Sequence, residues 1–236
     1  MPRRQIAGTG GLVFHVLNRG VRRTQLFDQH GDYQAFLLLV AEACRRVPVR
    51  LLAYCLMPTH FHFIVWPSED GQLSRFMWWL TTTHSKRWHM WRGTTGTGHV
   101  YQGRFKAFPV ETKDYFLTVC RYVERNPLRA NLVTKAEDWP WSSLAQRCRM
   151  RNTVPLEAWP ILPPLNWLEL VNGLQTQAEV EALRQSIASG RPYGSDSWVG
   201  SVASDFGLPE RARRPGRPRK TTPGVVSRKQ LPALFS

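Results

Sequence analysis

The chain has 236 residues, 42% of them hydrophobic, and its 32 lysines and arginines outweigh 17 acidic residues to give a net charge of +15. This length accommodates one full domain plus an appendage, and the charge favours a polyanionic partner. No segment approaches the length of a membrane span, and the first residues lack the apolar stretch of a secretory signal. The four cysteines form no C-x-x-C pair, as is typical of reduced thiols. We therefore expect a cytoplasmic, nucleoid-associated protein.

Alternating and helical patterns of apolar residues predict a regular series of elements in the first half of the chain. In chain order they are a strand over 12–17, a helix over 32–46, strands over 50–56 and 61–66, a helix over 73–91, a strand over 104–110 and a helix over 112–126. The order β-α-β-β-α-β-α predicts an α+β fold, namely a ferredoxin-like α/β sandwich with an antiparallel sheet and one added helix.

The character of the sequence changes after residue 135. Trp139 to Ser143 has the composition of a packed connection, and the proline-rich stretch 155–167 that of a structured loop or linker. Helices are predicted over 178–189 and 195–205. Residues 211–220 carry six basic side chains and no acid, which is typical of a tail that is disordered in isolation. We therefore predict a core over 1–135, a helical extension over 136–208, and a basic DNA-binding tail over 209–236.

The segment around His60 and His62 suggests a metal site. In a strand, residues i and i+2 project to the same face, so both imidazoles point the same way and Phe61 and Phe63 point into the opposite layer. Two imidazoles side by side can hold one divalent ion. The alternative is that these histidines line an edge of the core.

Tyr122 and Asn126 lie one turn apart on the helix predicted over 112–126, with Thr112 as its N-cap and Pro127 ending it at Asn126. This spacing places a phenol beside a neutral oxygen ligand. The alternative is a half-buried packing tyrosine. Tyr115, two turns earlier on a similar face, competes for any nucleophilic role, but Tyr122 is favoured by its Y-x-x-x-N spacing.

Four segments of the chain resemble those of REP-associated tyrosine transposases, relatives of the single-tyrosine HUH transposases of bacterial insertion sequences. The resemblance covers about residues 10–145, and Gly190 to Gly194 with the basic tail resembles the C-terminal part of the same group. The insertion-sequence enzymes usually place Gln four residues after the tyrosine, where this chain has Asn126. The matching segments are His15-Val16-Leu17-Asn18-Arg19-Gly20, Met57-Pro58-Thr59-His60-Phe61-His62, Gly103-Arg104-Phe105-Lys106-Ala107 and Arg121-Tyr122-Val123-Glu124-Arg125-Asn126-Pro127-Leu128-Arg129-Ala130.

The resemblance implies a metal-dependent single-strand DNA endonuclease and strand-transferase that acts on REP-type hairpins. We expect Tyr122 to attack phosphorus and form a 5′-phosphotyrosine, and His60, His62 and Asn126 to hold Mg²⁺ or Mn²⁺. The alternative is a regulator that binds DNA or RNA hairpins without cleaving them. The expected partner is single-stranded or hairpin DNA, with no membrane, and the oligomeric state is open between monomer and homodimer.

Basic residues near these motifs are candidates for contacts to nucleic acid. Asn18 and Arg19, followed by Arg22 and Arg23, form a basic turn suited to phosphates.

Arg104, Lys106 and Phe108 alternate on a predicted strand and are expected to line a groove for a single strand; the alternative is a solvated edge face. Arg217, in a Pro-Gly-Arg-Pro stretch similar to an AT-hook core, is a candidate for the minor groove, against the alternative of a nonspecific basic tail.

Overall fold

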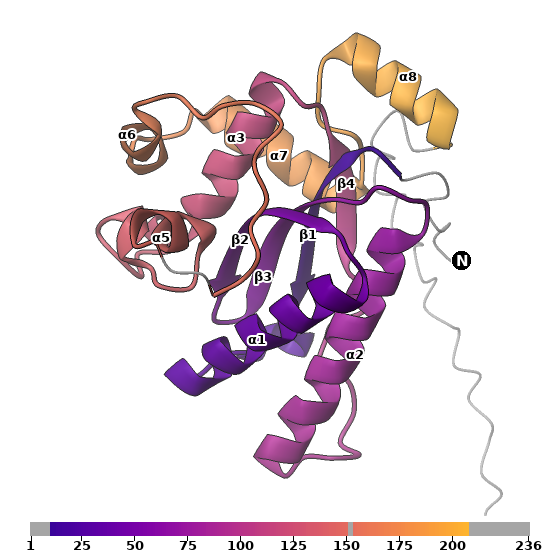
Figure 1. Cartoon of the computed structure of the whole chain (residues 1–236), viewed down its shortest axis with the longest axis vertical. Coiled ribbons are helices and arrows are strands. Elements are labelled where there is room, and N and C mark those ends of the chain that lie inside the picture. The colour runs from indigo at the N-terminus through magenta and orange to yellow at the C-terminus, as the bar shows by residue number, and fades with distance from the viewer. Residues whose placement is uncertain (1–9, 151–152, 208–236) are drawn as a thin grey trace, which may run out of the picture.

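The computed structural model describes residues 10–150 and 153–207 of the chain. Its centre is a four-stranded antiparallel sheet with the order β2-β3-β1-β4 (Figure 1). The strands are β1 (Val13–Arg19), β2 (Arg50–Met57), β3 (His60–Trp66) and β4 (Lys106–Val110). This strand order is that of a ferredoxin-like sheet, and the predicted fold class is confirmed.

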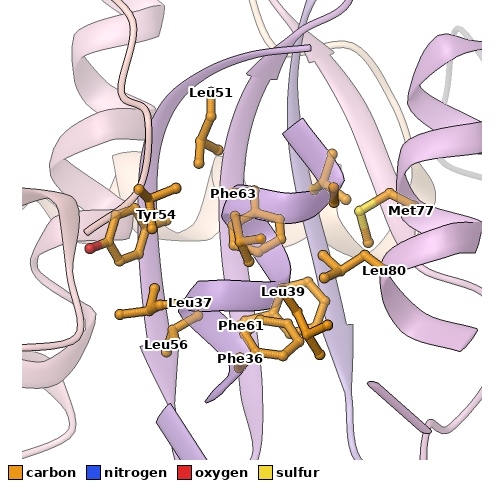
Figure 2. Close-up of a cluster of buried hydrophobic side chains, with 14 of the residues drawn as sticks. Phe36, Leu37, Leu39, Leu51, Tyr54, Leu56, Phe61, Phe63, Met77 and Leu80 are labelled. Atoms are coloured by element: carbon orange, nitrogen blue, oxygen red, sulfur yellow. The ribbon is translucent and has the colours of Figure 1, made fainter. Parts of the chain in front are cut away.

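Helices α1 (His30–Arg46) and α2 (Gln72–Arg92) cover one face of the sheet (Figure 1). Phe61 and Phe63 of β3 point into this layer, are fully buried, and meet Phe36 of α1 (Figure 2). Because side chains alternate along a strand, His60 and His62 face the other way, as their spacing predicted.

Helices α3 (Asp114–Glu124) and α7 (Gln177–Ser189) cover the opposite face of the sheet (Figure 1). A second hydrophobic cluster fills this layer and joins Ile64 and Phe108 of the sheet to Val119 of α3 and Leu183 of α7. A register shift between Leu51 and Ala53 interrupts the pairing of β2 with β3 and lets Leu52 join this cluster as well. The paired histidines therefore lie in the layer that α3 covers.

The predicted course of the chain around Asn126 is wrong in two details. The N-cap of α3 is Lys113 rather than Thr112. The chain also does not leave helical geometry at Asn126, because the short helix α4 (Asn126–Arg129) follows Arg125 directly. Pro127 occupies the first turn of α4, where a missing N–H group breaks no helical hydrogen bond.

The extension contains helices that were predicted and helices that were not. The helices predicted over 178–189 and 195–205 are present as α7 and α8 (Asp196–Phe206). The other elements of the extension are short and were not predicted: the 3₁₀ turn η2 (Ala136–Asp138), α5 (Ser143–Cys148) and α6 (Trp167–Asn172). A further 3₁₀ turn that was not predicted, η1 (Val21–Arg23), follows β1 in the core. The packed connection before α5 is confirmed, since Leu56 N–H of β2 donates to Trp141 O at 2.9 Å.

Buried polar contacts fasten the extension to α3. The carboxylate of Glu124 is completely buried and accepts hydrogen bonds from Ser143 Oγ (2.7 Å), Arg147 Nη1 (2.9 Å) and Trp167 Nε1 (2.9 Å). One residue on, Arg125 Nη1 donates to Val171 O (2.9 Å) at the end of α6. These contacts tie α5 and α6 to the helix that carries Tyr122.

The Gly190–Gly194 segment extends the sheet at its β4 edge. Tyr193 pairs in parallel with Val110, through Tyr193 N to Pro109 O and Glu111 N to Tyr193 O, both 2.9 Å. Within residues 10–150 and 153–207, no helix is long and apolar enough to cross a membrane. The tail predicted over 209–236 lies outside the described residues.

Candidate active site

Three histidines meet on the α3 face of the sheet. His60 and His62 come from β3, and the strand pairing places His15 of β1 opposite Ile64, diagonally across from His62. His15 Nε2 lies 2.9 Å from His62 Nδ1, and their ring centroids are 5.1 Å apart. His60 Nδ1 lies 3.0 Å from Thr59 Oγ1. The Nδ1 atoms of both predicted metal ligands are thus engaged within the protein.

Burial keeps these histidines neutral. It lowers the pKa of His15 to about 3 and that of His62 well below its usual value, because a charged imidazole loses its hydration there. Burial also lowers the pKa of His60 to about 4, with further lowering by the positive charges of Arg19 and Arg129. A neutral imidazole is the form that binds a metal ion.

Tyr122 of α3 lies against this histidine cluster. Its ring centroid is 6.1 Å from that of His62 and 6.4 Å from that of His15, both edge-on, and its side chain is buried. Tyr115, the competing tyrosine, packs edge-on against Tyr193 with centroids 5.4 Å apart. Over the part of the chain that the structure describes, Tyr115 makes no ring contact with a histidine. The structure therefore brings Tyr122 to the histidines and places Tyr115 elsewhere.

Asn126 meets Tyr122 through Arg129 of α4. The Arg129 guanidinium carbon lies 4.1 Å from the centre of the Tyr122 ring, and its Nη2 donates a hydrogen bond to Asn126 Oδ1. Asn126 Nδ2 donates to Val123 O at 3.4 Å, and the residue is almost fully buried. The predicted proximity of a phenol and an amide is thus present, with a guanidinium added to the pair.

The donor set fits a metal ion in part. Through Nε2, His62 would bind a metal only with its proton on Nδ1, and the His15 Nε2 atom can accept that proton's hydrogen bond. The amide oxygen of Asn126 has two lone pairs, of which Arg129 uses one. Among the described residues, no group of three or more His, Cys, Asp or Glu side chains is arranged to hold a metal. The two histidines would therefore need oxygen ligands such as Asn126 to complete a site.

The candidate DNA-binding residues of β1 and of the turn after it differ in how accessible their side chains are to a ligand. Asn18 is buried on the face opposite the histidines, where Nδ2 donates to Gly103 O (3.4 Å) and Oδ1 accepts from Arg19 N–H (2.9 Å). The Arg19 Nε group is buried without a hydrogen-bond partner. Arg22 and Arg23 are exposed, with positive φ angles of 49° and 63° that side-chain-bearing residues rarely adopt.

The predicted groove strand is only partly as expected. Arg104 is exposed but precedes β4, which begins at Lys106, so the two do not alternate along one strand. Phe108 is fully buried beside His15, with ring centroids 4.9 Å apart, so its predicted role in lining a groove is wrong. Arg217 lies outside the described residues.

Two residues of the site were not predicted as functional, His15 and Arg129. His15 stands in the first motif, and the ferredoxin-like order places its strand next to that of the paired histidines. These two facts together could have predicted that His15 lies at the site. Arg129 follows Tyr122 by seven residues and Asn126 by three, which is a helical spacing that continues past Pro127.

The model of a transposase family matches residues 9–126 of this chain, which places the protein among the transposases. The chain is a member of the family described as "Transposase IS200 like". It is 28% identical over 139 residues to the REP-associated tyrosine transposase of Escherichia coli (strain K12), a match that covers 57% of this chain and 76% of the relative.

A solved structure described as a REP-associated tyrosine transposase bound to a REP hairpin is also similar. The TM-score is 0.50 and the identity 23%, over 70% of this chain and 94% of that chain, which supports the common fold. Together with the family match, these similarities confirm the resemblance seen in the sequence motifs.

Proposed function

We propose that this protein is a metal-dependent single-strand DNA endonuclease and strand-transferase that acts on REP-type hairpins in the cytoplasm, at the nucleoid. The observation that carries the proposal is the placement of Tyr122 against the neutral, buried pair of His15 and His62. Membership in the transposase family supports a DNA-processing role.

In the proposed reaction, the Tyr122 oxygen attacks the scissile phosphorus. A phosphorus–oxygen bond to tyrosine forms, the bond to the 3′ oxygen breaks, and the phenol proton ends on the departing 3′-hydroxyl. The products are a 5′-phosphotyrosine and a free 3′-OH, and attack by another 3′-OH reverses the step and joins strands. His60, His62 and Asn126 would hold Mg²⁺ or Mn²⁺, which when bound supplies charge stabilisation for the pentacoordinate phosphorus.

We propose hairpin DNA as the substrate on the basis of the descriptions of the known relatives. One is named REP-associated, and the similar solved structure is described as bound to a REP hairpin. A net charge of +15 suits a phosphate backbone of either form. The exposed Arg104 and Lys106 and the half-buried Arg19 remain our candidates for phosphate contacts, with Asn18 supporting the loop at Gly103.

A second candidate function is a hairpin-binding regulator that does not cleave. It is favoured by the hydrogen bond from Arg129 to Asn126 Oδ1, because a metal would have to share that oxygen with a guanidinium. Asn also has a shorter stem than the Gln of insertion-sequence enzymes.

The two candidates differ in whether a covalent adduct forms. The test incubates the full chain with Mn²⁺ and labelled single-stranded hairpins taken from repeated palindromes of the source genome, then resolves the products on denaturing gels. We expect a protein–DNA adduct that carries a label placed 3′ of the cut. Tyr122→Phe, which loses one oxygen, should bind the hairpins and yield no adduct, whereas the matched variant Tyr115→Phe should still yield it.

An adduct kept by Tyr122→Phe and lost by Tyr115→Phe would assign the nucleophile to the other tyrosine. Tight binding without any adduct, in the wild type as well, would support the regulator. A matched RNA hairpin that binds more tightly than the DNA form would extend that second function to RNA.

A further inference from the structure

Arg129 contacts both Tyr122 and Asn126. The carbon of its guanidinium lies over the tyrosine ring, 4.1 Å from the ring centre, and Nη2 donates a hydrogen bond to the Asn126 amide oxygen. Its Nη1 atom is buried and has no hydrogen-bond partner. The side chain is therefore fixed on two sides and has one unpartnered donor.

The buried Nη1 group of Arg129 has a free-energy cost because it lacks a hydrogen-bond partner. Leaving a buried polar group unpaired costs about 1–3 kcal/mol, and more for a charged group, so native structures rarely keep one without a function. A purely structural arginine at this position would be expected to use its remaining donors on carbonyl groups, as Arg121 and Arg125 do at the end of α6. Arg129 instead keeps a donor beside the phenol.

A second arginine approaches the same histidines from β1. Arg19 also has a buried donor without a partner, its Nε group. The charges of both Arg19 and Arg129 act on His60 and His62, and both lower the pKa of those imidazoles. Two positive groups with unused donors thus lie around the histidine pair, and a single anion in reach of both would satisfy them.

We propose that Arg129 is a catalytic residue of strand cleavage, whose free guanidinium edge binds a non-bridging oxygen of the scissile phosphate while Asn126 holds it beside Tyr122. The inference rests on the function proposed above and adds a phosphate-binding role that the histidines and tyrosine do not fill. As the bond from Tyr122 to phosphorus forms and the 3′ oxygen leaves, negative charge grows on the non-bridging oxygens. A guanidinium binds such oxygens through parallel N–H donors and stabilises that charge.

The test measures single-turnover adduct formation for Arg129→Ala, with the labelled hairpin and Mn²⁺ and with protein in excess. Removal of one donor aimed at a developing charge lowers a rate by roughly 100- to 1,000-fold, and we expect a loss of that size. The hairpin dissociation constant should change by less than about threefold, because the contact strengthens in the transition state. Added methylguanidinium should restore part of the rate, at least about tenfold.

Arg50→Ala is the matched control. Its guanidinium also lies over an aromatic ring, 3.4 Å from the centre of Trp66, but at the opposite end of β3 from His60. This variant should form the adduct at the wild-type rate. Mn²⁺ affinity, measured by calorimetry, should be unchanged or higher in Arg129→Ala, which frees the Asn126 oxygen.

Several results would overturn the inference. A wild-type rate in Arg129→Ala, with or without a lower melting temperature, would make Arg129 a packing residue. A weaker hairpin complex with an unchanged rate would make it a ground-state contact, and a loss of Mn²⁺ affinity would place its action in the metal site. If Arg129→Ala does not fold, Arg129→Lys decides: it keeps the charge without the planar fork and should slow the reaction about tenfold, and an unchanged rate would refute the role. A wild-type chain that forms no adduct would instead remove the proposed function, and this inference with it.

Discussion

The Nδ1 atom of His62 contacts a second imidazole, that of His15. Histidines that bind metals usually donate their other N–H to a carboxylate or a carbonyl. Here the acceptor is His15 Nε2, which burial keeps neutral, so His62 can be held in one tautomer without bringing a negative charge into the site. Among the described residues, Arg19 and Arg129 are the arginines whose charges act on His60 and His62, so a phosphate bound there would meet positive charge.

The proposed metal dependence can be tested at His60. His60→Ala should lower adduct formation by at least about 100-fold and weaken Mn²⁺ binding measured by calorimetry, because one of the two proposed imidazole ligands is lost. The fold should survive, since His60 is half-buried and its one side-chain bond goes to the neighbouring Thr59. The exposed His99→Ala is the control and should behave as wild type. Full activity of the wild type in EDTA would refute metal dependence.

We predict that the protein loses stability in acid because His84 is buried in its neutral form. Burial lowers its pKa to about 3, and its Nδ1 lies 2.6 Å from the Tyr101 hydroxyl. An unfolded histidine takes up a proton below about pH 6.5, so the native state loses stability from there down to about pH 3, by roughly 2 kcal/mol at pH 5 for this one group. His84→Asn should start less stable at pH 7 and lose less on acidification, as followed by urea unfolding at both pH values. The control His99→Asn should keep the wild-type slope, and an equal slope in His84→Asn would refute the assignment.

The helix α3 links the sheet, the site and the extension. Tyr122 points from it to the histidines, while Glu124 is buried among α5, α6 and β2. Burial raises the pKa of the Glu124 carboxyl, and the bonds from Arg147, Ser143 and Trp167 oppose that effect. One helix therefore places the proposed nucleophile and anchors the C-terminal residues at the same time.

Glu124→Ala should cost about 3–5 kcal/mol in the free energy of unfolding, because Arg147, Ser143 and Trp167 lose the completely buried carboxylate that they bind. Urea titration followed by tryptophan fluorescence measures the change. The surface pair of Arg149 and Asp138, 4.0 Å apart, provides the comparison. Asp138→Asn should change stability by less than about 1 kcal/mol. Equal losses in the two variants would show that Glu124 contributes no more than an exposed charge.

Periodicity predicted the core elements well because each is long enough to show it. The helices α1 and α2 span more than four turns, and every predicted core strand has a counterpart in the sheet. The helices α5 and α6 have six residues each, which is too few for a helical pattern to stand out. Their positions depend on distant partners such as Glu124, and these contacts have no local signal in the sequence.

The site residues show the same difference between local patterns, which can be predicted, and contacts between distant segments, which cannot. The facing of His60 and His62 followed from strand alternation, and Tyr122 from the spacing within one helix. His15 and Arg129 belong to the site only because β1 pairs with β3 and because the chain continues as α4 after Arg125. Phe108 was misplaced because alternation gives the two faces of a strand without saying which one is covered, and α3 covers this one.

Charge is distributed unevenly along the chain. The net charge is +15, and residues 211–220 supply six basic side chains with no acid. Charge of this kind adds affinity for phosphates without reading sequence and makes binding strongly dependent on salt. The tail is therefore a candidate for holding DNA near the site, separately from the chemistry.

Deleting residues 211–236 should weaken hairpin binding at low salt and flatten the dependence of the binding constant on salt. Each phosphate that the tail no longer neutralises should reduce the logarithmic slope by about 0.7 for a single strand. Fluorescence anisotropy at several salt concentrations measures both. A shorter deletion of 221–236 keeps the six basic residues and should retain most of the slope. Identical slopes for the wild type and the longer deletion would exclude the tail from binding.

The arginines that anchor α6 bear on how small a working fragment can be. The family match ends at residue 126, which would invite an experimenter to trim the gene near that point. Such a fragment would lack Arg129, and Arg121 and Arg125 would lose the α6 carbonyls that they now bind. The last turn of α3, where Tyr122 sits, would then fray. We therefore expect the smallest autonomous unit of this transposase to reach at least to the end of α6, because the helix that carries Tyr122 contacts residues that the family match does not include.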